Sequence, residues 1–334
     1  MKIVVDAFGG DHAPIEIIKG CALAVKEYGV TVVLVGDSSV IEKTIADENI
    51  DKNGLEIVHA PEVITMEDDP LSVIKSKKNS SMATAFRVLK DGNADAFVSA
   101  GNSGAVLVGA TMIVKRIKGV KRAALAPVIP SDQGPMMLID CGANVECTPE
   151  YLVQFGIMGS LYMKHMFHLE NPRVGLLNNG TEECKGTSLQ KEAYPLLAAE
   201  KSIHFIGNVE ARDMVFGACD VAVADGFTGN IALKVYEGVG KMLAGNISNM
   251  FKKNLRTKLG ALFVMDGINA FRKKMDYKEH GGAPLMGISK PVVKAHGSSD
   301  ARAFKNAIHQ AILFANSGMI EQIEKNIVQT NDLT

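Results

Sequence analysis

Short apolar runs recur along the chain, and each ends in a polar loop that contains glycine. The runs are four to six residues long, the length of a strand buried in a parallel sheet. Six such segments occur, at residues 3–14, 96–105, 137–144, 174–186, 203–213 and 221–230. Ligands of open α/β sheets bind beyond the carboxyl ends of the strands, so we expect these loops to meet along one edge. Their backbone N–H groups and short polar side chains suit an anion, and phosphate fits best.

Strand-like and helix-like segments alternate along the whole chain, which is typical of an α/β layer fold. We predict helices at 15–28 and 148–167, and a last one at 299–327 with a break near Gly318. Strands are predicted at residues 2–6, 31–36, 55–58, 94–99, 123–128, 136–140, 173–178, 203–207, 220–224 and 292–294. Because no repeat, low-complexity tract or linker interrupts the pattern, we interpret residues 1–334 as one α/β domain.

Residues 238–277 differ from the rest and read as a projecting helical hairpin. Within 238–274 there are at least seven Lys and Arg but a single acid, Asp266. Cations at 252, 253, 256 and 258 flank apolar side chains at helical spacing, namely Leu255, Leu259, Leu262 and Phe263. Such a stripe either packs in a dimer or touches an anionic lipid surface, and one hairpin can do both.

Several classes of function are disfavoured by what the sequence lacks. It contains no G-x-G-x-x-G after a strand and no phosphate-binding G-x-x-x-x-G-K-[ST], which argues against nicotinamide and ATP enzymes. The formal net charge of −1, the 6% aromatic content and the absence of Trp argue against nucleic-acid binding. His165 and His168 share a helix face but form a weak metal signal, so we predict no metal and no cofactor. Five Cys without a C-x-x-C pair indicate free thiols in a reducing cytoplasm.

Two of the loops carry side chains that could bind phosphate. The first joins a strand to a helix through Asn102, Ser103 and Gly104, although capping of that helix alone explains these residues equally well. The second places Lys185 just past a strand, in a loop that also contains Asn178, Asn179 and Gly180. A lysine there can neutralise an oxyanion, whereas the plainer alternative is a solvated surface lysine.

Further candidates lie in three other loops. One loop offers Asn230 as a donor, together with Asp225, Gly226, Thr228 and Gly229. The first loop of the chain contributes Asp6, Gly9, Gly10, Asp11 and His12. Near the C-terminus, His296 is the best candidate for general acid–base chemistry, with Ser298 beside it; a structural histidine is the alternative.

Eight of these strings, taken together, resemble the PlsX family of acyl-ACP:phosphate acyltransferases. They are D-A-F-G-G-D-H-A-P, S-A-G-N-S-G-A, D-C-G-A-N, L-L-N-N-G-T-E-E-C-K-G, G-N-V-E-A-R-D, D-G-F-T-G-N, G-G-A-P-L-M-G and V-K-A-H-G-S-S-D. They occur in the order of the family and span residues 6–300. The chain departs from the common pattern at Phe8, where Met is usual, and at Ser103, where Thr is usual.

The resemblance implies a layered α/β sandwich with a mixed, mostly parallel sheet, like the isocitrate and isopropylmalate dehydrogenases. It implies a homodimer that transfers an acyl group from acyl-ACP to inorganic phosphate. The acyl phosphate would pass to a membrane glycerol-3-phosphate acyltransferase in phospholipid synthesis. From the residues themselves, we take Lys185, Asn230 and His296 as the candidate catalytic residues, and we expect a cytoplasmic protein at the inner face of the cell membrane. Two alternatives are acyl transfer from acetyl-CoA, as in phosphate acetyltransferases, and a non-catalytic scaffold for lipid enzymes.

Overall fold

Two sheets form the centre of the molecule. The structure, a computed structural model, describes residues 1–275 and 281–331, without the side chains of residues 262, 269–275 and 329–331. The first sheet has seven strands in the order β3 (Leu55–His59), β2 (Thr31–Gly36), β1 (Lys2–Asp6), β4 (Ala96–Ser99), β12 (Val292–Ala295), β11 (Gly282–Met286) and β5 (Ala124–Leu125). The second has five, in the order β6 (Val128–Ser131), β7 (Gly134–Ile139), β10 (Val221–Val223), β8 (Arg173–Asn178) and β9 (His204–Glu210).

The two sheets are mostly parallel, with antiparallel strands at one side of each. In the first sheet, β11 runs antiparallel to both β12 and β5. In the second, β6 pairs antiparallel with β7, while the other pairs are parallel. The predicted mixed α/β class is confirmed, but the strands divide into two sheets rather than one.

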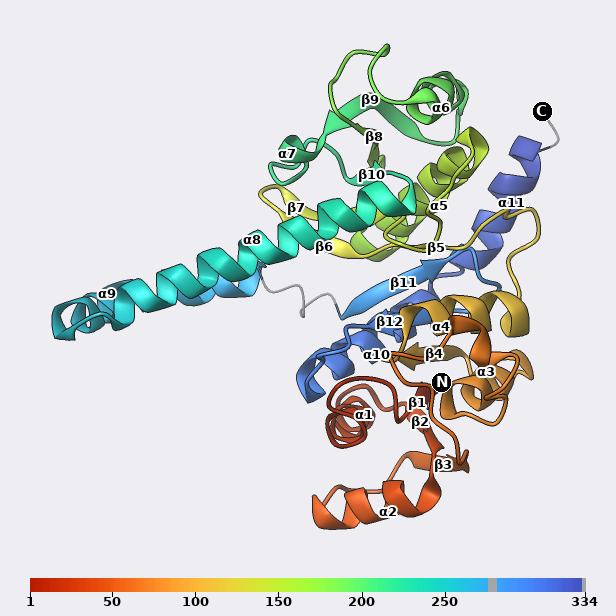
Figure 1. Cartoon of the computed structure of the whole chain (residues 1–334), viewed down its shortest axis with the longest axis vertical. Helices are drawn as coiled ribbons and strands as arrows, with labels where there is room; N and C mark the ends of the chain where they lie inside the picture. Colours follow the sequence, from red (N-terminus) through yellow and green to blue (C-terminus); the bar gives the residue numbers. More distant parts are fainter. Residues whose placement is uncertain (276–280, 332–334) are drawn as a thin grey trace.

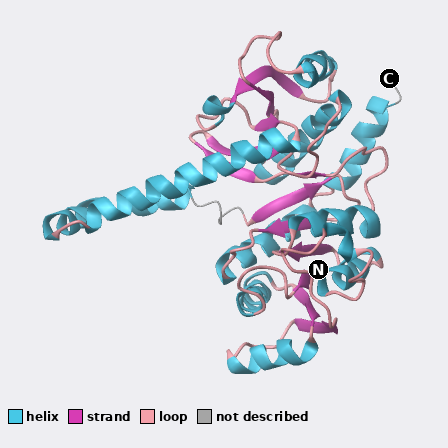
Figure 2. Cartoon of the chain, viewed as in Figure 1, coloured by secondary structure: helices cyan, strands magenta, loops and turns pink. Residues whose placement is uncertain are grey.

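Helices cover both faces of the sheets (Figures 1 and 2). The α-helices are α1 (Ile15–Tyr28), α2 (Ser38–Asp47), α3 (Ser81–Lys90), α4 (Ser103–Gly109), α5 (Pro149–Phe167), α6 (Ser188–Ala199), α7 (Ala211–Met214), α8 (Gly226–Lys252), α9 (Leu255–Met275), α10 (Ala301–Asn316) and α11 (Met319–Asn331). Two short helical segments, η1 (Pro70–Val73) and η2 (Ala110–Val114), flank the region of α3 and α4.

Strand β1 shows how alternating side chains build two cores on opposite faces of one sheet. Ile3 and Val5 pack with residues of α1 and α10, whereas Val4 packs with residues of α3 and α4. On the Val4 side the rings of Phe86 and Phe97 stack with their centroids 4.1 Å apart. Side chains of successive strand residues point to opposite faces, so a strand buried on both faces reads as a continuous apolar run.

Helix α8 leaves the body and, with α9, forms a projecting pair (Figure 1). Of the residues of α8, only the two glycines of its first turn, Gly226 and Gly229, are buried. The hairpin predicted at 238–277 therefore consists of the outer part of α8 and of α9, and its last two residues lie outside the described part of the chain. Leu255, Leu259 and Phe263 are exposed, Phe263 to 91%. Leu262 belongs to α9, but its side chain lies outside the described residues.

The predicted elements match the structure with identifiable exceptions. The helix at 15–28 is confirmed, and the long C-terminal helix is divided into α10 and α11 around Gly318, which has a φ of +63°. The strand predicted at 123–128 is wrong as a single element, because β5 ends at Leu125 and β6 begins at Val128 in the other sheet. Strand β11 was not predicted. Pro284 within it has no N–H to donate, which disguised the segment as a loop.

Candidate active site

A cavity of about 1170 Å³ lies where the loops of the two sheets meet helix α8. Four of the six predicted loops reach it, through Asp11, through Ser103 and Gly104, through Cys141 to Ala143, and through Asn230. The C-terminal loop adds His296 and Ser298. Within the described residues, the loops after β8 and β9 contribute nothing to its lining. The prediction that the polar loops converge thus holds for four of them.

The lining of the cavity combines an apolar wall with a surplus of positive charge. The apolar wall includes Leu107, Leu125, Val128, Ile129, Leu233 and Leu243. The charged side chains are the cations Lys234, Lys241, Lys294 and Arg302 and the acids Asp11 and Glu237. A site of this kind accommodates a ligand with a long apolar part and an anionic head.

Lys294 is the least exposed of these cations, with 7% of its surface accessible. It lies on β12, opposite Ser99 of the parallel neighbour β4. Its Nζ donates to the carbonyl oxygens of Ala295 at 2.5 Å and Ala100 at 3.3 Å. Burial lowers the pKa of this ammonium to about 8, although the carboxylates of Asp11 and Asp6 act in the opposite direction. Sequence reasoning missed Lys294, and the available signal was a lysine inside an otherwise apolar run.

His296 also lines the cavity, and its neighbour defines the tautomer of the ring. The backbone N–H of Ser298 donates to His296 Nδ1 at 3.2 Å, and Ser298 Oγ lies 2.9 Å from the same atom. Nδ1 is therefore an acceptor, and in the neutral ring the proton sits on Nε2. Burial lowers the pKa of His296, with Glu237 raising it and Lys294 lowering it further. The neutral ring is thus favoured near pH 7.

Asp6 is buried within the protein and does not line the cavity. Its carboxylate accepts hydrogen bonds from Ser81 Oγ at 2.6 Å and Ser99 Oγ at 2.8 Å. Burial raises the pKa of Asp6, and these hydroxyl hydrogen bonds oppose that shift. Gly9 packs so closely that a Cβ there would lie 2.5 Å from Asp6 Oδ2. Asp6 and Gly9 therefore shape the first loop from beneath.

The rest of the first loop continues to the cavity rim. Gly10 has a φ of +116°, which favours glycine. The N–H of Asp11 then donates to Gly297 O at 2.8 Å, which joins the first loop to the loop after β12. Asp11 lines the cavity, whereas His12 is exposed and lies outside the lining.

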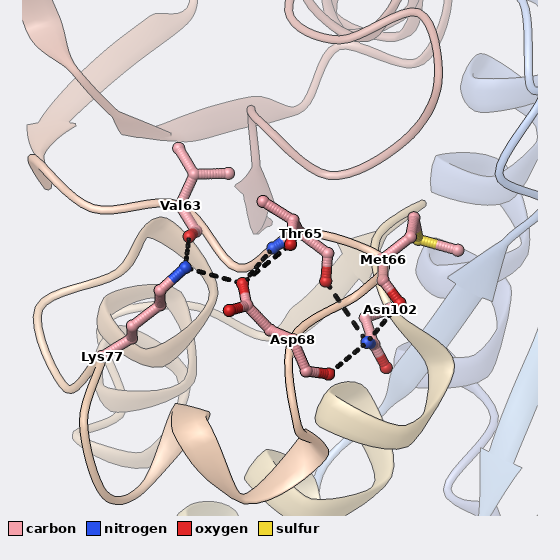
Figure 3. A network of polar contacts seen from close by, with 6 residues as sticks. All are labelled: Val63, Thr65, Met66, Asp68, Lys77 and Asn102. Carbon is pink, nitrogen blue, oxygen red and sulfur yellow. Dashed lines mark hydrogen bonds and ion pairs between the residues drawn. The ribbon is translucent and has the colours of Figure 1, made fainter.

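Asn102 caps α4 and fastens a neighbouring loop (Figure 3). Its Oδ1 accepts from the N–H of Ala105 at 3.1 Å. Its Nδ2 donates to the carbonyl oxygens of Thr65 and Met66 at 3.3 Å and of Asp68 at 3.2 Å. The amide of Asn102 is therefore engaged within the protein, while the next residue, Ser103, is exposed in the cavity.

The first turn of α8 packs tightly against the loop after β7. Asp225 caps the helix by accepting from the N–H groups of Phe227 and Thr228 and from Thr228 Oγ1. A Cβ on Gly229 would lie 2.0 Å from Asp140 O, and one on Gly226 would lie 2.6 Å from Asn144 O. Capping and close packing thus account for Asp225, Gly226, Thr228 and Gly229 without a ligand.

Asn230 differs from these four residues because it lines the cavity. Its side chain lies over Gly142, whose Cβ position would be 3.4 Å from Asn230 Nδ2. The loop that carries Gly142 is organised by the buried carboxylate of Asp140, which accepts from the N–H groups of Leu125, Ala143 and Asn144. Asn230 is thus a polar donor on the cavity wall, next to a loop that the carboxylate of Asp140 holds in place.

Lys185 lies in an exposed loop between β8 and α6, and it is not part of the cavity lining. Asn178 organises this loop: its Nδ2 donates to Lys185 O at 3.2 Å and its Oδ1 accepts from the N–H of Asn179 at 2.8 Å. The stem of Lys185 folds over Gly180, where an added Cβ would lie 3.0 Å from Lys185 Cγ. Asn178, Asn179 and Gly180 therefore shape the loop that presents Lys185.

Three charged residues of α8 and one of α10 also escaped the sequence analysis. Lys234, Glu237 and Lys241 follow Asn230 at intervals of three or four residues, so they share its helix face and line the cavity. Arg302 lies in the first turn of α10 and lines it too. The spacing on α8 was visible in the sequence, but nothing in it showed which face would turn toward the sheets.

The fold and the polar, cationic cavity are those of an α/β enzyme, and comparison with known proteins shows that it is an acyltransferase. The model of the family described as "Fatty acid synthesis protein" matches residues 1–322. The chain is 46% identical over 332 residues to the phosphate acyltransferase of Alkaliphilus oremlandii, covering 99% of each sequence. It is 45% identical over 332 residues to the phosphate acyltransferase of Thermoanaerobacterium thermosaccharolyticum, covering 99% of this chain and 98% of the relative. The chain belongs to this family, the PlsX family of phosphate acyltransferases.

Solved structures show a shared fold at much lower identity. A phosphotransacetylase from Streptococcus pyogenes superposes with a TM-score of 0.67 at 16% identity, covering 96% of this chain and 94% of that one. A 4-hydroxythreonine-4-phosphate dehydrogenase from Klebsiella pneumoniae superposes with a TM-score of 0.55 at 12% identity, covering 95% and 99%. In the described part of the chain, none of the helices combines the length and the apolar character that crossing a membrane requires.

Proposed function

We propose that this enzyme transfers a fatty acyl group from acyl-ACP to inorganic phosphate, giving acyl phosphate and free ACP. The observation that carries the proposal is the cavity, in which an apolar wall adjoins cationic and hydroxyl side chains. The names of the relatives at 45–46% identity support phosphate as the acceptor. A phosphate oxygen attacks the thioester carbonyl, a C–O bond forms, the C–S bond breaks, and the thiol of the carrier leaves with a proton.

This chemistry needs alignment and charge stabilisation more than a protein nucleophile. Asn230 and Ser103 supply polar donors, and neutral His296 supplies a proton donor at Nε2. The cations Lys234 and Lys241 of α8 favour an acidic carrier protein by electrostatic attraction. Lys185 remains a candidate for stabilising the oxyanion, although neither it nor its loop lines the cavity.

The same proposal covers assembly and location. We infer a single catalytic domain over residues 1–334 with a hairpin at 238–277 for dimer and membrane contact, and a fold related to the isocitrate and isopropylmalate dehydrogenases. The exposed side chains of Leu255, Leu259 and Phe263 beside basic residues support peripheral binding to anionic lipid from the cytoplasmic side. A membrane glycerol-3-phosphate acyltransferase would then consume the acyl phosphate in phospholipid synthesis.

The test is to incubate the purified protein with palmitoyl-ACP, with and without inorganic phosphate. We expect release of the ACP thiol and appearance of acyl phosphate only when phosphate is present. A preference for acetyl-CoA would instead support a phosphate acetyltransferase, which the large apolar wall of the cavity disfavours. A non-catalytic scaffold would release no thiol under either condition.

A further inference from the structure

We propose that Lys294 is the residue that binds the phosphate acceptor, contacting its oxygens through Nζ at the polar end of the cavity. The inference rests on the proposed function and names a residue for it. The first observation is position: Lys294 lines the cavity together with Ser103 and His296, yet it is nearly fully buried. The other lysines of the lining, Lys234 and Lys241, lie on the projecting helix α8.

The second observation is how firmly the ammonium is held. Two carbonyl oxygens, those of Ala295 and Ala100, accept from Nζ, which gives the charge a defined place. In the described part of the chain, no carboxylate lies close enough to form an ion pair with this ammonium. An ammonium carries three N–H donors, and these two carbonyls use two of them. A cation fixed in a region of low dielectric binds an anion more strongly than a solvated lysine does, because water competes less.

The third observation is the charge that surrounds it. Asp6, beneath the first loop, and Asp11, at the rim, act on Lys294 from the β1 side, and His296 lies two residues further along its own segment. Across the cavity, Glu237 and Lys241 of α8 act on His296. The carboxylate of Asp6 accepts from the hydroxyls of Ser81 and Ser99, so its hydrogen bonds are directed to these side chains and not to the lysine. The two carboxylates thus stabilise the ammonium from a distance, and its third N–H is left for an anion in the cavity.

A purely structural lysine is the competing explanation, since the two hydrogen bonds also tie β12 to the loop after β4. The two roles differ in what a substitution changes. Loss of a structural tie lowers stability and the amount of folded enzyme, and it affects both substrates alike. Loss of a phosphate ligand acts on phosphate alone.

The experiment compares Lys294→Met with Lys290→Met, an exposed lysine at the start of the same segment that lies outside the cavity lining. For Lys294→Met we expect kcat/KM for phosphate to fall about 100-fold, as for loss of one preorganised charge-stabilising group. The KM for palmitoyl-ACP should stay unchanged. Added phosphate should raise the Tm of the wild type and of Lys290→Met but not of Lys294→Met. Parallel losses toward both substrates, or a normal phosphate response, would overturn the assignment.

A measurement on the wild-type enzyme covers the case in which Lys294→Met does not fold. As pH rises through about 8, the ammonium loses its proton. Inorganic phosphate is already a dianion there, and His296 is already neutral, so the KM for phosphate should rise while that for the acyl donor stays constant. A phosphate KM that is flat across this range would refute the role of Lys294. Absence of phosphate-dependent thiol release from the wild type at any pH would instead refute the proposed function itself.

Discussion

The side chain of Asn102 binds the backbone of Asp68, while the side chain of Asp68 binds other partners. Asn102 Nδ2 donates to the main-chain carbonyl of Asp68 at 3.2 Å, and the Asp68 carboxylate turns away to accept from Lys77 Nζ at 2.6 Å and Thr65 N at 2.7 Å (Figure 3). Lys77 in turn donates to Val63 O at 2.9 Å. This network holds the loop that carries Met66 against the cavity.

Replacing Asn102 with Asp should separate its two roles. A carboxylate can still cap α4, but it cannot donate to the three loop carbonyls and instead repels them. We expect the free energy of unfolding to fall by about 1–3 kcal/mol, the range for buried polar groups left unpaired. Urea unfolding measures this. Asn93→Asp, in an exposed turn, is the control, and an equal effect in both variants would contradict the role of the network.

Gly229 should tolerate no side chain, whatever its relation to the substrate. A Cβ there would lie 2.0 Å from Asp140 O, so Gly229→Ala must push α8 away from the loop after β7. We expect a loss of at least about 2 kcal/mol of stability, as for overpacked cores. Thermal unfolding followed by circular dichroism measures the change.

The matched control for Gly229 is Gly245, in the same helix, where no heavy atom lies within 4 Å of an added Cβ. Gly245→Ala should stabilise the protein by up to about 1 kcal/mol through helix propensity. Two stable alanine variants would show that α8 does not pack as described.

Lys294 makes the stability of the protein depend on pH in a defined window. Its pKa is lowered from the ordinary 10.5 to about 8, so between these values the unfolded chain binds a proton that the folded chain does not. The contribution of Lys294 to the unfolding free energy therefore rises with pH across this window. Its burial penalty is fully present below about pH 8.

Lys294→Met removes this term and provides the measurement. The stability of the variant minus that of the wild type should fall by about 3 kcal/mol from pH 8 to 10.5, at about 1.4 kcal/mol per pKa unit. Urea titrations of both proteins at the two ends of the window test it. A difference that does not vary with pH would show that the ammonium is not desolvated in the folded protein.

Lys185 remains a prediction from the sequence. If it stabilises the developing oxyanion, Lys185→Ala should lower turnover about 100-fold while the protein stays folded. Lys191→Ala, on the neighbouring helix α6 and also exposed, should leave turnover unchanged. Steady-state assays with palmitoyl-ACP and phosphate distinguish the two, and near-normal turnover in Lys185→Ala would remove it from the mechanism.

The hairpin should govern location without governing chemistry. Leu259→Glu combined with Phe263→Glu places charge on two exposed apolar positions of α9. We expect the double variant to stay in the supernatant when anionic vesicles are sedimented, while its activity on soluble acyl-ACP persists. Leu23→Glu, at an exposed position of α1, should still sediment with the vesicles. A change in oligomeric mass of the double variant would assign these residues to a dimer contact instead.

Most strands of the first sheet could be predicted because they are buried on both faces. The runs at β1 and β2 are almost continuously apolar, and such a run by itself predicts a strand buried on both faces. Strand β11 escaped because pairing with β12 and β5, a tertiary effect, overrides the poor strand signal of Gly282 and Pro284. The strand at 123–128 failed for a related reason, since Pro127 separates segments that join different sheets.

The site was predicted less completely, because sequence shows which residues are polar but not what they face. Asn102 and Thr228 were expected to contact a ligand, yet neighbouring backbone and the cap of α8 engage them. Gly226 and Gly229 are likewise explained by close packing, because a side chain at either position would clash with the loop after β7. Lys294 is the opposite case: a lysine in a strand suggests an edge position, but β12 lies between β4 and β11 and Lys294 is buried.

Helix α8 carries the cavity wall and the root of the hairpin in one uninterrupted element, from Gly226 to Lys252. An α-helix turns by about 100° per residue. The number of residues between Asn230 and the tip therefore determines the direction in which the tip faces relative to the side chain of Asn230. One residue inserted after Gly245, beyond the last residue of α8 that lines the cavity, would rotate the tip by about 100° about the helix axis. The number of residues in α8 thus fixes the direction in which the exposed side chains of the hairpin face relative to the cavity.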